Sequence, residues 1–62
     1  MFNKKDYILF VEQLFQIELG MEQEARELQA MVDNPKAKKL LQHIIDDEIK
    51  HQGIVNDMKG LV

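Results

Sequence analysis

The sequence predicts an all-α fold, an antiparallel two-helix hairpin that dimerises into a four-helix bundle. Two long stretches carry apolar residues at helical spacing, and one strong helix-breaking segment, Asp33-Asn34-Pro35, separates them. Because a short turn joins two helices into an antiparallel pair, the chain is expected to form a single hairpin. Its apolar faces are too wide for one neighbouring helix to cover, so we expect a second copy to cover the remainder.

The first helix is expected over about residues 4–32. Asn3 is a good N-cap, and Asp6, three positions later, completes a capping box. No proline interrupts this stretch, and its apolar residues fall on two neighbouring rows. One row contains Tyr7, Phe10, Leu14, Ile17, Met21, Leu28 and Met31, and the other contains Ile8, Val11, Phe15, Leu19, Ala25 and Val32. A face of this width is typical of a helix in a bundle.

The turn is expected at residues 33–35 and the second helix at about residues 35–59. The residue before a proline is pushed out of the helical region, whereas proline fits the first position of a helix. Asn34 is therefore the expected N-cap, and Gly60 is the expected stop. A carboxylate and an imidazole interrupt one apolar stripe of this helix. The stripe contains Ala37, Leu41, Ile44, Glu48, His51, Val55, Met58 and Val62.

Composition narrows the class of protein. The 62 residues suffice for one domain, and so short a chain buries little of its surface, so we expect a metal or a partner chain to add stability. The absence of cysteine excludes disulfides and thiolate metal sites. A net charge of -3 argues against nucleic acid as a partner. No apolar run is long enough to span a bilayer and no signal peptide is recognised, so we expect a cytoplasmic protein without a membrane partner.

The interrupted stripe contains the candidate site. The Glu48-x-x-His51 spacing puts both side chains on one face of a helix, one turn apart. With the turn centred near Asn34, Glu18 falls at a level between Glu48 and His51, and it also interrupts an apolar face. Desolvated carboxylates are costly, and a metal cation is one of the few partners that satisfies several together. Glu18, Glu48 and His51 are therefore the candidate metal ligands, and no catalytic residue is assigned beyond them.

Two further acidic residues are candidates for supporting roles. Glu22 lies one turn from Glu18 on the same face, roughly 6 Å away by helix rise. It is a candidate outer partner of the ligands or a residue on the path by which the metal arrives. Asp47 lies four residues before His51 and is placed to accept its spare ring N–H. Exposure to solvent is the alternative for Asp47.

Three ligands do not complete the coordination of one iron. A two-fold dimer doubles them to four glutamates and two histidines, the ligand set of ferritin-like di-iron carboxylate proteins. Glu18, the Asn34-Pro35 turn and the segment Asp46-Asp47-Glu48-Ile49-Lys50-His51 resemble the ferritin-like superfamily, in particular two-helix half-ferritins such as encapsulated ferritin. The resemblance covers about residues 14–58. It implies a ferritin-like four-helix bundle in a homodimer or a larger homo-oligomer.

The resemblance also implies a cofactor and an activity. Two irons per dimer lie between the subunits, with Glu18 bridging or chelating iron, Glu48 bridging the two irons and His51 as the terminal nitrogen ligand. The implied function is ferroxidase-type oxidation of Fe(II) by O2 in iron handling. Mixed glutamate and histidine ligands also suit manganese or zinc.

The resemblance does not extend to every feature of these proteins. The C-terminal helix and encapsulin-targeting tail of encapsulated ferritins have no counterpart here, so an encapsulin shell is not carried over as a partner. Ile17 and Gly20 occupy positions beside Glu18 where those proteins have acidic residues, so their path for iron is not carried over either. The competing function is a non-catalytic helical hairpin that acts as an oligomerisation or protein-interaction module, whose polar residues set the register. Metal binding separates the two hypotheses.

Overall fold

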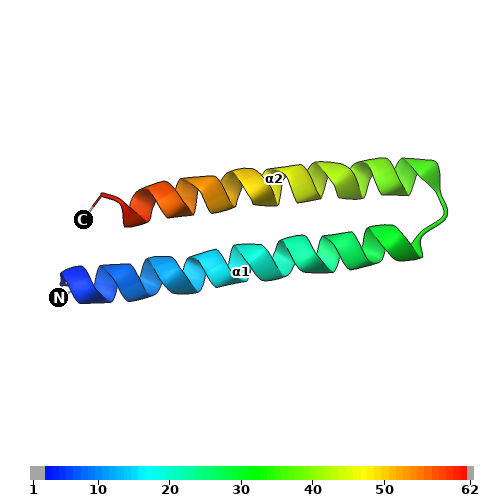
Figure 1. Cartoon of the computed structure of the whole chain (residues 1–62). Coiled ribbons are helices and arrows are strands. Elements are labelled where there is room, and N and C mark those ends of the chain that lie inside the picture. The colour runs from blue at the N-terminus through cyan, green and yellow to red at the C-terminus, as the bar shows by residue number, and fades with distance from the viewer. Residues whose placement is uncertain (1–2, 62) are drawn as a thin grey trace.

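The computed structural model describes residues 3–61, so Val62 of the predicted stripe lies outside it. Two helices, α1 (Lys4–Met31) and α2 (Pro35–Lys59), lie antiparallel and pack against each other (Figure 1). The hairpin measures 48 × 15 × 14 Å. The predicted all-α class and helical hairpin are confirmed for the described residues. Neither α1 nor α2 has an apolar stretch long enough to cross a membrane.

α1 begins at the predicted capping box. The Asp6 N–H donates to Asn3 Oδ1 at 2.9 Å, and the Asn3 N–H donates to Asp6 Oδ2 at 3.3 Å. The first bond satisfies one of the backbone donors that an α-helix leaves unpaired in its first turn. α1 ends at Met31, one residue before the predicted end, because Val32 adopts extended backbone with φ -96° and ψ 144°.

α2 begins at Pro35, with Asn34 as its N-cap. Asn34 Oδ1 accepts the Ala37 N–H at 3.0 Å, and proline occupies the first turn, where its missing N–H has no intrahelical partner to lose. α2 ends at Lys59, and Gly60 is the C-cap. Gly60 has φ -76° and ψ -8°, which is right-handed backbone. The predicted stop is therefore in the right place, although it does not use the left-handed conformation that favours glycine at helix ends.

The core is a row of side chains between the helices, spaced alternately by three and four residues, which we call the seam. This alternation is typical of helices that pack side by side as coiled coils. Among the described residues the buried apolar side chains are Val11, Ala25, Ile45 and Val55. α1 and its C-cap contribute Ile8, Val11, Phe15, Glu18, Glu22, Ala25, Gln29 and Val32 to the seam. α2 contributes Leu41, Ile45, Glu48, Gln52 and Val55.

The structure corrects the predicted stripe of α2 at two positions. Ile45 lies fully buried in the seam, whereas Ile44 is 47% exposed. Gln52 likewise occupies the seam, and His51 is exposed beside it. The prediction was wrong here because α2 has two adjacent rows with the same spacing, and only the position of α1 decides which row is covered.

Large apolar side chains remain exposed on one side of the hairpin. All of them except Met58 directly precede seam residues, so in each helix they are rotated by about 100° from the seam in the same sense. Because the helices are antiparallel, this rotation brings both rows to the same side, which we call the open face. It contains Phe10, Leu14, Ile17, Met21, Leu28 and Met31 of α1, and Leu40, Ile44, Ile54 and Met58 of α2, all exposed or half-buried.

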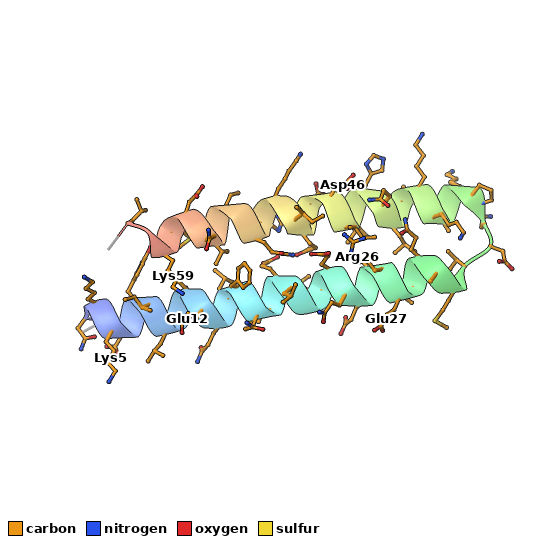
Figure 2. The ribbon with its side chains drawn as sticks, viewed as in Figure 1. Lys5, Glu12, Arg26, Glu27, Asp46 and Lys59 are labelled. Atoms are coloured by element: carbon orange, nitrogen blue, oxygen red, sulfur yellow. The ribbon has the colours of Figure 1, made fainter. Side chains whose placement is uncertain are left out.

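Polar contacts join the helices towards both ends of the hairpin. The Tyr7 hydroxyl donates to the Met58 carbonyl at 2.8 Å. Lys59 Nζ forms an ion pair with Glu12 Oε1 at 3.2 Å (Figure 2). At the other end, Gln29 Nε2 donates to a main-chain carbonyl near the start of α2 at 3.0 Å. These contacts fix the register of the helices, and the register decides which side chains face each other in the middle.

Candidate metal centre

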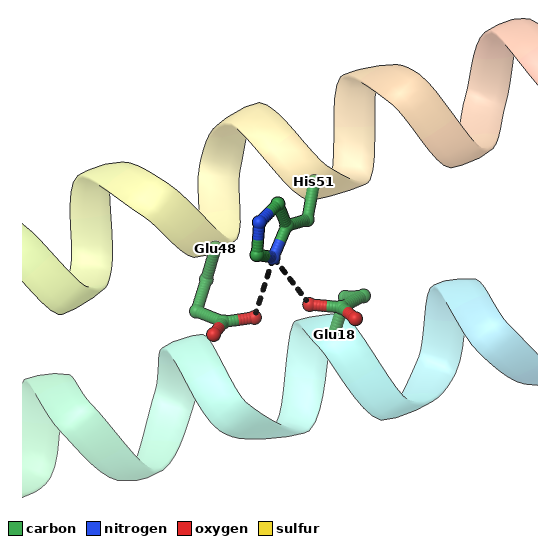
Figure 3. Close-up of side chains that lie close together, drawn as sticks. All are labelled: Glu18, Glu48 and His51. Carbon is green, nitrogen blue, oxygen red and sulfur yellow. Dashed lines mark hydrogen bonds and ion pairs between the residues drawn. The ribbon is translucent and has the colours of Figure 1, made fainter.

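Three polar side chains meet in the middle of the hairpin. Glu18 projects from α1 at the level of Glu48 and His51 on α2 (Figure 3). One ligand atom from each residue lies within 4.8 Å of the others. His51 Nδ1 lies 3.3 Å from Glu18 Oε2 and 3.8 Å from Glu48 Oε2. The structure therefore brings together the three residues that the sequence places at one level, and no other such group occurs in the described part of the chain.

Glu48 is the buried member of this cluster. Glu48 is 6% exposed, and its Oε2 has no hydrogen-bond partner in the described protein. The Glu18 side chain is 16% exposed and that of His51 is 52% exposed. A buried polar atom without a partner is costly, so the carboxylate of Glu48 needs either a proton or a cation.

The two carboxyl groups shift each other's pKa in opposite directions. Hydrogen bonding to Glu48 holds the pKa of Glu18 below its usual value, partly offset by burial and reinforced by His51. The hydrogen bond with Glu18, followed by burial and the charge of Glu18, raises the pKa of Glu48. The opposite shifts mean that a proton shared by the pair is favoured on Glu48 over Glu18.

His51 approaches the carboxyl pair from the open face. Because His51 directly precedes the seam residue Gln52, its ring reaches over the edge of the seam and presents Nδ1 to both carboxyl groups. Most of the surrounding positions on this face belong to the two apolar rows, and the charged residues Glu24 and Asp47 lie among them. A cation held by the three side chains therefore lies where the hairpin is open and not in an enclosed core.

Glu22 lies one turn from Glu18 but is held away from the cluster. Gln52 Nε2 donates to Glu22 Oε1 and Arg26 Nε donates to Glu22 Oε2, both at 2.6 Å. These two hydrogen bonds, first that of Gln52, lower the pKa of Glu22. Arg26 directly follows the seam residue Ala25, so this group lies on the side of the hairpin opposite the open face.

Asp47 was a candidate from the sequence, whereas the two partners of Glu22 were not. Asp47 is exposed, and within the described residues no hydrogen bond joins it to His51. Sequence reasoning missed both Arg26 and Gln52. The spacing of Glu22 and Arg26 is that of a helical ion pair, which was the available signal for one of them. Gln52 shows only as a member of the seam, once the seam is known.

Comparisons of the chain with protein-family models, with curated proteins and with solved structures found no match. The chemistry of the cluster is therefore argued from its donors. Two carboxylates and one imidazole suit Fe(II), Mn(II) or Zn(II), and two carboxylates neutralise the charge of a divalent cation. A cation among these donors also gives the unpaired oxygen of Glu48 a partner, so the residues present fit a metal ion.

In the metal-free protein, the carboxyl pair will contribute most to stability at a pH between the lowered pKa of Glu18 and the raised pKa of Glu48. The contribution of Glu18 is lost as the pH falls through its lowered pKa, and that of Glu48 is lost as the pH rises through its raised pKa. The two values lie on either side of the ordinary 4.5 of a glutamate. Thermal unfolding with a chelator, from about pH 3 to about pH 8, measures this profile.

The variant Glu48→Gln isolates the contribution of Glu48. A neutral amide still donates to Glu18 but never ionises, so the loss of stability as the pH rises through the raised pKa of Glu48 should disappear. At pH 7 we expect the variant to exceed the metal-free wild type by about 1 kcal/mol, the cost of a buried unpaired acceptor. Glu27→Gln, on the exposed outer side of α1 (Figure 2), is the control. A wild type at least as stable as Glu48→Gln at every pH contradicts the shared proton.

Proposed function

We propose that this protein is a di-iron carboxylate protein of the ferritin-like kind, with its metal site between two copies of the hairpin, and that it oxidises Fe(II) with O2. The observation that supports this most directly is the buried Glu48 beside Glu18, with one oxygen unpaired and an imidazole within reach. Two carboxylates in a seam without a counterion are costly to desolvate. A divalent cation offsets that cost and gives each donor a partner.

A second copy of the chain is the proposed partner at the open face. Three protein donors leave one iron incompletely coordinated, and two irons even more so. A second hairpin adds three donors and brings the set to four glutamates and two histidines. The apolar rows extend along both helices on either side of the cluster, so covering them removes apolar surface from water. The same association therefore stabilises the hairpin and completes the site.

In the proposed reaction Fe(II) is the substrate and O2 is the electron acceptor. Binding needs ionised Glu18 and Glu48 and neutral His51, so any proton that the carboxyl pair shares is released when the site is loaded. Carboxylates interact more strongly with the higher charge of Fe(III), which favours loss of an electron from Fe(II). In the proposed dimer, the covered apolar rows keep bulk water away from the donors. The same donors also suit manganese or zinc.

Loss of a proposed ligand will lower the metal content. Glu48→Gln and His51→Ala should each weaken Fe(II) binding by about tenfold or more, because each removes a donor from the cluster. Elemental analysis after anaerobic loading and desalting measures this. His43→Ala removes an exposed imidazole outside the cluster and is the matched control. If both ligand variants keep the wild-type metal content and only weaken association, the interaction-module hypothesis replaces the metal site.

Oxidation is a separate prediction from binding. Wild-type protein will accelerate the oxidation of Fe(II) in air, followed by the ultraviolet absorbance of Fe(III), because its carboxylates favour the Fe(III) product. Glu18→Gln removes one of these carboxylates and should bring the rate close to that of buffer, whereas Glu27→Gln should keep the wild-type rate. A wild type that binds iron but oxidises it no faster than buffer reduces the function to metal binding.

A charge on the open face will dissociate the proposed dimer. Met21 and Leu9 are 47% and 48% exposed, but Met21 lies on the open face, whereas Leu9 directly follows the seam residue Ile8 and lies on the opposite side. Met21→Lys should raise the dimer dissociation constant by more than about tenfold, because it buries an unpaired charge in the interface. Leu9→Lys should leave the dimer intact in sedimentation equilibrium. Equal behaviour of the two variants places the interface elsewhere.

A further inference from the structure

The Glu22 carboxylate is close to the cluster but takes no part in it. It lies in the seam one turn from Glu18, about 6 Å along the helix axis. A glutamate side chain has several rotatable bonds, and the backbone of α1 places Glu22 on the same row as Glu18. Nothing in the helix geometry therefore keeps this carboxylate from a cation held by Glu18.

Two hydrogen bonds hold the Glu22 side chain away from the cluster. Gln52 engages Oε1 and Arg26 engages Oε2, so neither oxygen is free. The Glu22 side chain is 14% exposed and that of Arg26 is 52% exposed. Arg26 is thus a half-exposed cation placed to neutralise a nearly buried carboxylate, at the level next to the cluster and opposite the open face.

We propose that Arg26 keeps Glu22 out of the coordination sphere of the metal and thereby limits each hairpin to three protein donors. The inference rests on the proposed metal site. A fourth donor from each hairpin would take a coordination position that is otherwise left for O2 or for an incoming Fe(II). Arg26 is therefore a positioning residue, which acts through Glu22. It leaves a coordination position free for the reaction, and as a consequence the metal is bound less tightly than it could be.

The variant Arg26→Gln tests this with Co(II), whose visible absorption depends on its coordination number. Gln52 still engages Oε1 of Glu22 in this variant, but freeing Oε2 from Arg26 should tighten Co(II) binding by about tenfold, the size of effect that outer partners of metal ligands have. The visible bands should weaken as a donor is added, and the oxidation of Fe(II) should slow. Arg26 is half-exposed and exposed ion pairs contribute little to stability, so the variant keeps the fold. Arg26→Lys keeps a cation at this position and should behave as the wild type.

A second substitution assigns the effect to Glu22. In Arg26→Gln combined with Glu22→Gln, the affinity for Co(II), its spectrum and the oxidation rate should return to wild-type values. Wild-type affinity and spectrum in Arg26→Gln alone overturn the inference while leaving the metal site in place. A weaker Co(II) complex in Glu22→Gln alone also overturns it, because Glu22 is then already a ligand. Failure of the wild type to bind Co(II) counts instead against the proposed function.

Discussion

Two carboxyl groups at one level of a narrow seam are the constraint on which the middle of this hairpin depends. Glu48 is buried with an unpaired oxygen, and Glu18 faces it from the other helix. Without a cation, the pair reduces its charge by holding one proton, and that arrangement becomes less favourable as the pH rises. With a cation, the same pair becomes a ligand set. The groups that weaken the apolar packing of the seam are therefore the groups best suited to bind a metal.

Register decides whether this pair forms. A shift of one residue along either helix turns a side chain by about 100° around the axis, and Glu18 then no longer faces Glu48. Apolar packing alone fixes register weakly, and the described chain has few buried apolar side chains. Hydrogen bonds are directional, so Tyr7 on the Met58 carbonyl at one end and Gln29 on α2 at the other hold the helices in place. The cluster thus depends on residues more than two turns away from it.

The sequence was sufficient for features that depend on local or regular geometry. The capping asparagines act on N–H groups three residues away, so both helix starts were predictable. Glu18 could be placed level with Glu48 and His51, because both helices rise equally from a turn at a known position. The choice between Ile44 and Ile45 was not predictable. That choice depends on how α2 is rotated against α1, which involves the packing of every seam residue at once.

The rotation of α2 also bears on the proposed dimer. If His51 lay in the seam, one hairpin would enclose the ligand set; because it lies on the open face, a cation bound by the three side chains would sit at the edge of the hairpin, where the proposed second copy could reach it. Covering the apolar rows and completing the coordination sphere then involve the same surface. In such a dimer each process favours the other, since binding to the associated state stabilises it and association keeps water from the ligands. A single two-helix hairpin is too thin to enclose a metal ion, but two hairpins can bind one between them.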